Sequence, residues 1–416
     1  MTTVTDSSGP AALKAYRAGT DRVVDPSATI ERVTPMFPVF GITRVADVTG
    51  LDRIGIPVVM VVRPNARSLS VAQGKGIDIT AARASGIMES IESWHAERID
   101  LPLRIGSVSD LRWSVPLVPA DKLPRCREVP FSPDVQLLWV EGRELTSETP
   151  VFLPYELVHT NYTLPRPTGA GMFLATSNGL ASGNIFQEAC SHALSEVIER
   201  DSTTLWRLRS AAARGQTRLD LSSVDDPLCG RVLQALADAD VAVGVWETTS
   251  DVKVASFYCV IVDREDTPLD RLHAAGGMGC HPSRHIALLR ALTEAAQSRL
   301  TLIAGTRDDV VGEDYRRARA PQSLIRERQA ILQEPGKVPF DSVPTAVFPT
   351  VDEDVRFQLD RLREAGLDQA FAVDLTRPEV EIPVVRIVVP GLEGPSDIAG
   401  YMPGLRARAM TAGRTP

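Results

Sequence analysis

Residues 70–97, SVAQGKGIDITAARASGIMESIESWHAE, and residues 177–201, SNGLASGNIFQEACSHALSEVIERD, repeat one pattern along the chain. Each begins with a glycine-rich segment and continues into a run with helical spacing that carries an E-x-x-E pair. In each copy the two glutamates follow a glycine, Gly76 or Gly183, by 13 and 16 residues. The pairs are Glu89 with Glu92, and Glu196 with Glu199. Because positions i and i+3 share one face of a helix, each copy predicts a glycine-rich turn followed by a helix with two carboxylates on one face.

A third stretch, residues 276–300 (GGMGCHPSRHIALLRALTEAAQSRL), matches this pattern more loosely. Glu294 falls where Glu89 and Glu196 fall in the other copies, and Gln297 takes the place of the second glutamate. The sequence therefore predicts an internal repeat whose third copy carries one carboxylate.

The repeated glutamates suggest metal and phosphate binding. Mg2+ prefers carboxylate and phosphate oxygens, and two E-x-x-E pairs on separate helices suit two or more such ions around a triphosphate. Glycine turns and helix N-termini offer backbone N–H groups to phosphate oxygens. Lys75, within QGKG, can reach a phosphate as a point charge.

A simpler interpretation of the same glutamates is a solvated helix face or a set of salt bridges. Arg83, Arg200 and Arg290 would supply the cations for such pairs. Against this, the neighbouring residues are apolar, and a buried carboxylate needs a partner. On the first helix these neighbours are Ala84, Ile87, Met88, Ile91 and Trp94. Spacing alone leaves both interpretations open.

Strand and helix patterns alternate along the chain. Runs rich in β-branched and apolar residues predict strands near 56–63, 135–141, 241–248, 255–263 and 384–389. Helical spacing predicts helices near 79–97, 185–210, 227–239, 284–304, 321–333 and 353–366. This mixture predicts an α/β or α+β fold.

We expect one long domain between two short tails. The tails cover residues 1–13, expected to be disordered, and residues 406–416, and the domain covers 14–405. Two proline-rich stretches, 113–134 and 144–170, predict surface loops.

Composition excludes several classes of protein. A net charge of −8 over 416 residues does not suggest a nucleic-acid partner. The start, MTTVTDSSGP, lacks the order of a signal peptide, and the apolar run at 56–62 is too short to cross a bilayer. The five cysteines lie far apart without a C-x-x-C pair, and Cys259 is expected in the core. We therefore expect a cytoplasmic protein without a membrane partner or a zinc site.

Read as long motifs, the repeated stretches resemble the YcaO family, and the likeness runs from about residue 14 to residue 405. It is carried by S-x-x-QGKG followed by A-x-x-S-x-I-M-E-x-I-E-x-W-H-A-E, and by SNGLASGN-x-x-x-E-A-x-x-H-A-L-x-E-V-I-E-R-D. The segment GITRVADVTGLDRIGIPV and the RPN tripeptide at 63–65 have the same family character. The resemblance implies repeated sheet-and-helix units around a central ATP site, with Mg2+ as the metal.

The resemblance also assigns roles to individual residues. The metal ligands that it implies are Glu89, Glu92, Glu188, Glu196 and Glu199. With Lys75, the expected ATP contacts are Arg22, Ser27, Asn184, Glu188, Arg200, Arg290 and Glu294. The family's S-x-x-N-x-x-x-E element has Ala181 in place of its serine, so one expected nucleotide hydrogen bond is in question. No residue is assigned as a catalytic acid or base.

The mechanism implied by the resemblance is ATP-dependent activation of a peptide amide. A nucleophile attacks the amide carbonyl, the oxyanion takes the γ-phosphoryl group, and phosphate then leaves with the amide oxygen. A neighbouring Cys, Ser or Thr side chain as nucleophile would give an azoline. An external sulfur donor would give a thioamide.

Two features favour the thioamide. Azoline-forming members often carry a fused peptide-recognition or E1-like domain, for which this chain has no room, and commonly end in P-x-P-x-P. This chain ends ARAMTAGRTP, and its VVRIVVPGLEG…YMPGLRAR segment resembles stand-alone members that act beside a TfuA-like partner. We therefore expect a ribosomal precursor peptide or protein as substrate and a TfuA-like protein as partner.

Other functions remain as alternatives. One is an azoline-forming cyclodehydratase of the same family, and another is a non-catalytic ATP-binding accessory factor for a ribosomal-protein methylthiotransferase. An ordinary kinase or ligase is disfavoured, because neither a G-x-x-x-x-G-K-[ST] motif nor a kinase signature set is present. The sequence does not name the peptide or the sulfur donor, and a homodimer stays open.

Overall fold

The computed structural model describes residues 12–265, 274–309 and 321–413. Within these ranges, no helix combines the length and the apolar composition needed to cross a membrane. All five cysteines are buried and free, in agreement with the core position expected for Cys259. Most of the expected tail over residues 1–13 lies outside the described residues.

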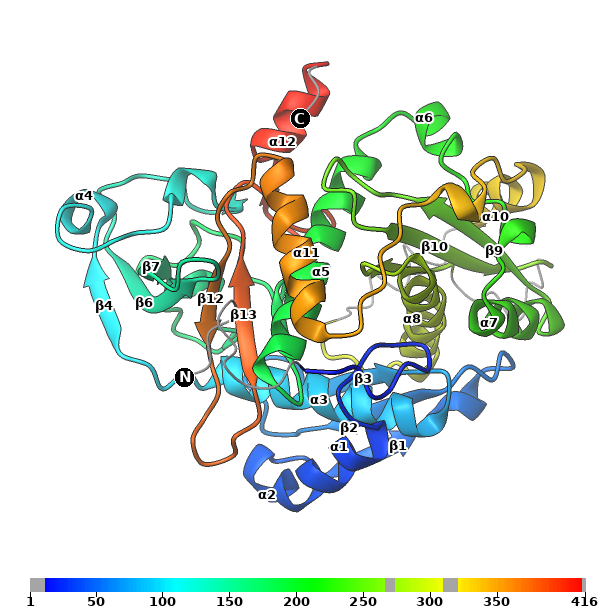
Figure 1. Cartoon of the computed structure of the whole chain (residues 1–416), viewed down its shortest axis with the longest axis horizontal. Coiled ribbons are helices and arrows are strands. Elements are labelled where there is room, and N and C mark those ends of the chain that lie inside the picture. The colour runs from blue at the N-terminus through cyan, green and yellow to red at the C-terminus, as the bar shows by residue number, and fades with distance from the viewer. Residues whose placement is uncertain (1–11, 266–273, 310–320, 414–416) are drawn as a thin grey trace.

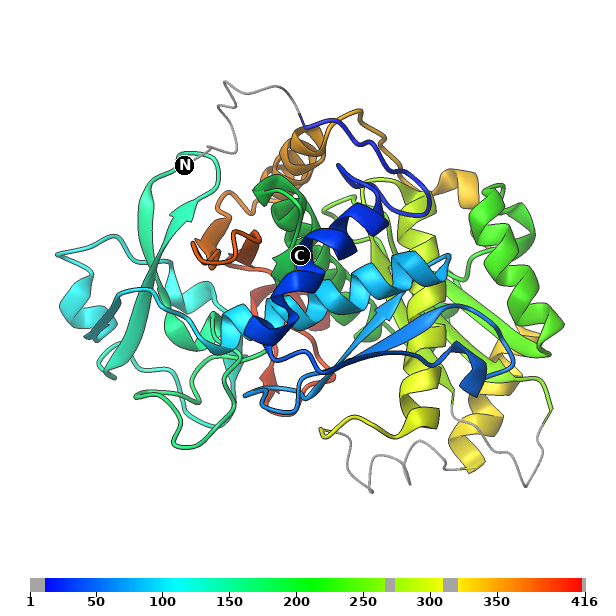
Figure 2. The ribbon, with the colours of Figure 1, turned by 90° about the horizontal axis from the view of Figure 1, so that it is seen from below.

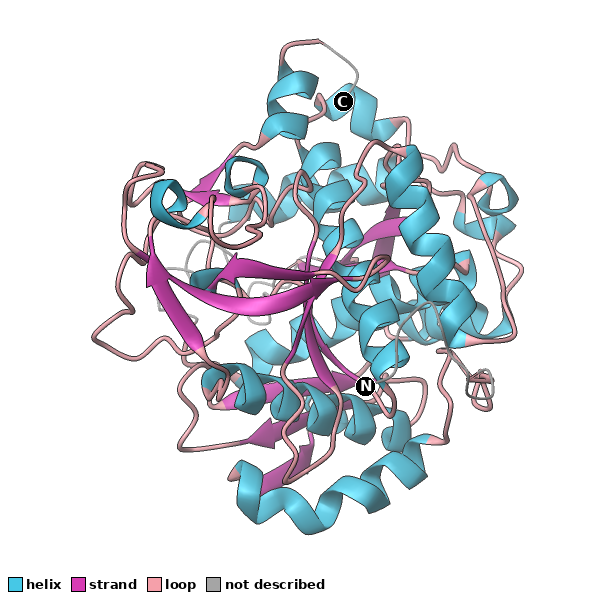
Figure 3. Ribbon diagram, turned by 60° about the vertical axis from the view of Figure 1, so that its left-hand side comes forward, coloured by secondary structure: helices cyan, strands magenta, loops and turns pink. Residues whose placement is uncertain are grey.

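Within the described part of the chain, the strands form four antiparallel sheets (Figures 1 and 3). The first sheet has the order β1 (Arg44–Asp47), β2 (Val58–Val62), β3 (Val71–Lys75). The second has the order β11 (Ala275–Cys280), β10 (Ser256–Asp263), β9 (Val241–Glu247). The largest has the order β4 (Leu103–Gly106), β6 (Leu137–Glu144), β12 (Phe371–Asp374), β13 (Val384–Val388), β8 (Leu180–Ser182), with β7 (Pro150–Pro154) also paired to β6. A small sheet pairs β14 (Tyr401–Met402) with β5 (Arg125–Cys126).

Three long helices each follow an edge strand of one sheet. Helix α3 (Ile79–Glu97) follows β3, α5 (Phe186–Arg207) follows β8, and α8 (Arg284–Ala304) follows β11. In Figure 1, α3 runs below α5 and α8. The other helices are α1 (Pro26–Val33), α2 (Phe37–Phe40), α4 (Val108–Leu111), α6 (Ala211–Gly215), α7 (Pro227–Asp238), α10 (Pro321–Gln333), α11 (Val351–Glu364) and α12 (Leu405–Thr411).

The three strand–helix units contact one another in a closed cycle. Besides packing on its own strand, α3 contacts β8, α5 contacts β11, and α8 contacts β3. Figure 2 shows α3 crossing the molecule in front of the other elements of this cycle. The helix faces that carry the repeated glutamates therefore meet around one centre.

A shared hydrogen bond supports the third copy of the repeat. In the first unit the backbone N–H of Gln73 donates to Glu89 at 3.5 Å, and in the third the N–H of Met278 donates to Glu294 at 3.1 Å. Donor and acceptor are 16 residues apart in both units. Glu294 is therefore the structural counterpart of Glu89, as the spacing predicts.

Gly76 and Gly183 lie between a strand and the helix that follows it, where the sequence predicts glycine-rich turns, and two further glycines of the repeats lie within strands. Gly74 lies within β3 and Gly279 within β11. A Cβ atom at either position would lie 2.0 Å from a helix carbonyl oxygen, that of Ala82 or Ala287. These glycines allow the strand and its helix to pack backbone against backbone. Their main contribution is close packing that fixes the helix over its strand.

The expectation that residues 144–170 form a surface loop is wrong in part. Strand β7 forms there, with Val151 and Leu153 buried in the core beside β6. Its two prolines, Pro150 and Pro154, occupy the ends of the strand, where a missing N–H is tolerated. The proline-rich composition therefore predicted a loop where strand β7 forms.

The boundary expected at residue 406 falls inside helix α12. Arg406 is buried, and its guanidinium pairs with Asp201 of α5 and with Asp251. At the other end, the described part of the expected tail, Ala12 and Leu13, lies beside the start of α11, where Leu13 bridges to Thr350. Both ends of the described chain thus pack onto the domain.

Candidate functional site

The three helices enclose a cavity of about 730 Å3. Residues 18–24 form another part of its wall. All the residues that the sequence proposed for the site line this cavity, except Ser27; they are Arg22, Lys75, Glu89, Glu92, Asn184, Glu188, Glu196, Glu199, Arg200, Arg290 and Glu294. A volume of this size lies in the range of small-molecule and cofactor sites.

Carboxylates from all three helices line the cavity together. Burial raises the pKa of Glu89 to about 7, that of Glu92 to about 8 and that of Glu199 to about 7. The pKa of Glu196 is also raised by burial. Neighbouring glutamates add to these shifts, because like charges disfavour ionisation. Glu89 is exposed to the solvent inside the cavity, where Glu294 adds to the rise of its pKa.

Cations partly compensate this negative charge. Lys75 forms an ion pair with Glu294, and Arg200 lies 3.5 Å from Glu199. Burial opposes the charged form of Glu294, yet Lys75 and Arg200 outweigh it and hold its pKa below the usual value. The salt-bridge interpretation therefore applies to Glu294 and to Glu199, whereas Glu89 and Glu92 form no ion pair with another described residue.

Glu92 is held by the neighbouring unit. The backbone N–H and the hydroxyl of Ser182 donate to the same Glu92 oxygen, at 2.9 and 2.7 Å. Ala181, where the family motif has its serine, is fully buried in the core beside α5. Because side chains alternate along a strand, Ser182 faces the cavity and Ala181 faces away from it. The hydroxyl that β8 offers to the cavity is therefore that of Ser182.

One part of the cavity wall is cationic. Arg290 donates to Nδ1 of His192 at 3.2 Å and to the carbonyl of Cys280 at 3.3 Å. Burial and the like charge of Arg22 together lower the pKa of Arg290 to about 10. Burial, Arg290 and Arg22 likewise hold the pKa of His192 well below its usual value. Two guanidiniums that repel each other in a cavity wall form a binding site for an anion.

Glu188 connects this region to the N-terminal segment. One of its oxygens accepts the backbone N–H of Val23 at 2.5 Å. The other accepts the N–H and the side-chain amide of Asn184, at 2.7 and 3.1 Å. The Asn184 carbonyl oxygen in turn accepts the hydroxyl of Thr29 at 3.0 Å. Glu188 thus organises the wall as well as carrying a charge into it.

Ser27 does not line the cavity in this structure. It lies in the first turn of α1, where its N–H and its hydroxyl donate to the capping residue Asp25 at 2.8 and 2.6 Å. Asp25 is the capping residue and Ser27 is its hydrogen-bond partner, which is an ordinary arrangement at the start of a helix. The ATP contact that the resemblance implies for Ser27 stays a prediction.

Sequence reasoning missed several polar residues of the wall, among them Ser85, Ser182 and His192. A periodicity argument would have found Ser85 and His192. Ser85 lies four residues before Glu89 on α3, and His192 lies four residues before Glu196 on α5, so each shares the face of its glutamate. Ser182 needed the three-dimensional structure, because its partner Glu92 lies 90 positions away.

The donor set fits Mg2+ and a polyphosphate. Several carboxylates have pKa values raised toward or above neutrality by burial and mutual crowding, which a divalent cation would relieve. Oxygen ligands of this kind are those that Mg2+ prefers. The cationic wall of Arg22 and Arg290 offers charge to phosphate oxygens.

Comparison with known proteins agrees with this geometry. Residues 73–393 match the family model of the YcaO cyclodehydratases, described as ATP- and Mg2+-binding. An uncharacterized protein in the tfuA 3′ region of Rhizobium leguminosarum bv. trifolii is 36% identical over 402 residues, covering 94% of this chain and 92% of that protein. An uncharacterized protein of Methanothermobacter thermautotrophicus is 36% identical over 379 residues, covering 89% and 95%.

Solved structures share the fold. YcaO from Methanopyrus kandleri, bound with AMPPCP and Mg2+, superposes with a TM-score of 0.73 at 23% identity, covering 94% of this chain and 98% of that one. A heterocyclase in complex with substrate and cofactor superposes with a TM-score of 0.72 at 22% identity, covering 92% and 54%. These likenesses confirm the mixed α/β fold expected from the sequence.

Proposed function

Because the chain belongs to the YcaO family, and so uses ATP and Mg2+ to modify the backbone of peptides, we propose that its product is a thioamide in a ribosomally made peptide. The observation that carries this choice is the relative in the tfuA 3′ region, which is 36% identical and matches over nearly the whole of both chains. A TfuA-like protein is then the partner that delivers or activates the sulfur.

We infer that one group of cavity residues binds the metal and another binds the phosphates. The carboxylates that would hold Mg2+ ions all line the cavity together, and they are Glu89, Glu92, Glu188, Glu196 and Glu199. When bound, Mg2+ and ATP supply charge neutralisation and the phosphoryl group that activates the amide oxygen. Positioning and electrostatic stabilisation are the tasks left to the protein in such a transfer.

Three groups in the wall suit the phosphate end. Arg290 lies close enough to Arg22 for the charge of Arg22 to lower its pKa, although Glu199 and Asp21 act in the opposite direction. His192 accepts from Arg290 through Nδ1, so that its Nε2 carries the proton and is a hydrogen-bond donor. Buried beside two guanidiniums, His192 stays neutral and serves as a donor to an oxyanion.

An azoline is the second candidate product. It is favoured by the family's description as cyclodehydratases. The two products share the activation step and differ only in the nucleophile. The non-catalytic accessory role is less favoured, since the full set of carboxylates serves phosphoryl transfer better than mere binding of ATP.

Mass spectrometry separates the two products. The purified chain, a TfuA-like protein encoded beside it and a precursor peptide would be incubated with Mg2+, ATP and a sulfide donor. We expect the peptide to gain the mass difference between sulfur and oxygen, with one ATP consumed for each exchange. Loss of water from a peptide containing Cys, Ser or Thr would identify the azoline product instead. The Glu199→Gln variant is the matched control and should leave the peptide unchanged.

A further inference from the structure

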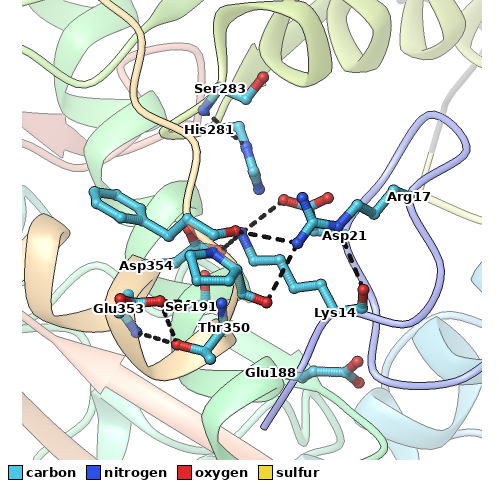
Figure 4. A network of polar contacts seen from close by, with 12 residues as sticks. Lys14, Arg17, Asp21, Glu188, Ser191, His281, Ser283, Thr350, Glu353 and Asp354 are labelled. Carbon is cyan, nitrogen blue, oxygen red and sulfur yellow. Dashed lines mark hydrogen bonds and ion pairs between the residues drawn. The ribbon is translucent and has the colours of Figure 1, made fainter. Parts of the chain in front are cut away.

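The side chain of Lys14 is buried between two carboxylates. Its ammonium lies 2.7 Å from Asp21 Oδ2 and 2.7 Å from Asp354 Oδ2, and the three side chains are 1%, 9% and 2% exposed. His281 completes the surroundings of this group, and its Nδ1 accepts the N–H of Ser283 at 3.0 Å. Figure 4 shows Lys14 reaching from the N-terminal segment toward these residues.

Asp21, His281 and Asp354 have the spacing of a metal site, with ligand atoms within 4.8 Å of one another. The chain itself supplies the cation here, because the Lys14 ammonium contacts both carboxylates. The two carboxylates therefore bind the Lys14 ammonium and hold the N-terminal segment in place, where a metal site would bind an ion.

What Lys14 fastens is an N-terminal strap, defined as residues 12–24. The outgoing half of the strap pairs with the start of α11, where the Lys14 N–H donates to the Pro349 carbonyl and the Val351 N–H to the Ala12 carbonyl, both at 3.1 Å. The chain then turns at Gly19, whose φ of +75° favours glycine. The returning half pairs with the outgoing half, since Tyr16 and Arg22 exchange two backbone hydrogen bonds of 2.9 Å.

The turn of the strap forms part of the cavity wall. Ala18, Gly19, Thr20, Arg22 and Val24 all line the cavity. Besides the backbone pairing of Tyr16 with Arg22, two contacts to side chains hold the returning half in place. The Asp21 carboxylate pairs with the Lys14 ammonium, and the Val23 N–H donates to the Glu188 carboxylate. Arg22 lies between these two anchors, so its position in the wall depends on both.

We propose that Lys14 is a positioning residue for ATP, which acts by holding Asp21 and thereby keeps Arg22 in the cavity wall. Lys14 itself does not line the cavity. Without its ammonium, Asp21 and Asp354 would be two buried carboxylates facing each other, and their repulsion would push the returning half of the strap outward. The proposal rests on ATP binding and is independent of whether the product is a thioamide or an azoline.

The test compares Lys14→Met with Arg17→Met. Arg17 is an exposed cation of the same strap, whose guanidinium donates to the Phe348 and Pro349 carbonyls at 3.5 and 3.3 Å. Calorimetry with Mg2+ and ATP should show at least about tenfold weaker binding for Lys14→Met, because only the fraction of molecules with a closed strap is competent. Binding by Arg17→Met should stay within about twofold of the wild type.

Hydrogen exchange supplies a readout that does not depend on the nucleotide. In the ATP-free Lys14→Met variant, the amides of Arg22 and Val23 should exchange faster, whereas those of β2 and α5 should keep their protection. At saturating Mg2+ and ATP, kcat should approach that of the wild type while KM for ATP stays high. Asp21→Asn breaks the same contact from the strap side and serves if Lys14→Met does not fold.

Wild-type affinity for ATP in Lys14→Met and Asp21→Asn would overturn the proposal, even if strap exchange increased. Equal loss of affinity in Lys14→Met and Arg17→Met would overturn it as well, because the effect would then belong to the strap as a whole. Failure of the wild-type chain to convert the peptide, with normal ATP binding, would count against the proposed product alone, because calorimetry and hydrogen exchange test the role of Lys14 without turnover.

Discussion

Arg406 and Asp201 form a two-point ion pair in the interior, although they lie 205 positions apart. Nε of Arg406 lies 3.0 Å from Asp201 Oδ1, and one terminal nitrogen lies 3.1 Å from Oδ2. Asp201 also accepts the backbone N–H of Glu393 at 2.9 Å. Because Asp201 follows Arg200 and Glu199 on α5, this pair fixes the C-terminal helix to the element that carries part of the site.

Replacement of Arg406 by Met should lower the free energy of unfolding by about 3–5 kcal/mol, because it leaves the carboxylate of Asp201 buried and unpaired. Urea unfolding followed by circular dichroism measures this change. Arg408→Met, on the exposed side of the same helix, should change the value by less than about 0.5 kcal/mol. Equal effects of the two substitutions would show that the pair contributes no more than a surface contact.

Binding of ATP should depend strongly on Mg2+. The wall carries crowded carboxylates that repel a triphosphate unless a cation lies between them. Calorimetry in EDTA should therefore give an affinity at least about tenfold lower than calorimetry with excess Mg2+. The same affinity in both buffers would argue that the carboxylates do not hold the metal.

Glu199→Gln should abolish peptide modification and leave the fold intact. The substitution keeps size and hydrogen bonding but removes one charge, and we expect activity to fall by at least about 100-fold. Burial and the neighbouring Glu294 and Glu196 raise the pKa of Glu199 to about 7, so relief of crowding should raise the melting temperature by about 2 °C. Glu31→Gln, on the exposed surface of α1, is the control. A fully active Glu199→Gln variant would assign Glu199 to a salt bridge.

His95 should make the fold sensitive to acid. Burial lowers its pKa to about 4, and the facing charges are those of Arg377, Glu379 and Asp374. Between pH 6.5 and pH 4 the unfolded chain takes up a proton at this position that the folded chain does not, so this contribution to stability is present above pH 6.5 and is lost as pH falls.

Comparison with a His95→Leu variant isolates this contribution. From pH 7.5 to pH 5, the wild type should lose about 2 kcal/mol of unfolding free energy relative to the variant. Urea unfolding at several pH values measures the difference. Parallel pH dependence of the two proteins would mean that His95 is protonated in the fold as readily as in the unfolded chain.

The long helices of this fold could be predicted from sequence, since their apolar periodicity extends over many turns. The six predicted helices and the five predicted strands all have counterparts within a few residues. The strands β3 and β11 were not predicted, because sequences such as VAQGK and AGGMGC lack the β-branched runs that indicate strands. Their glycines reflect packing against a helix, which only the structure reveals.

The central glutamates of the site could be predicted because the pattern that indicates them lies within short stretches of sequence. Regular spacing within one helix placed Glu89 and Glu92 together, and the repeat suggested Glu294. Relationships over long separations in sequence were not accessible in this way. Lys14 and Asp354 form a buried pair across 340 positions, and neither residue type nor spacing indicates it.

The pairing of β8 with β13 has a consequence for synthesis of the chain. Ser182, which holds Glu92, lies on a strand whose sheet neighbour is Val384–Val388. A nascent chain that has not yet extended past this strand carries every glutamate of the site but has no β13 to support β8, and it also lacks much of the core beneath β8. Domains form during translation only when their contacts have emerged. The ribosome must therefore translate past Val388 before ATP can be captured, so chains that end before this strand should not compete for the nucleotide.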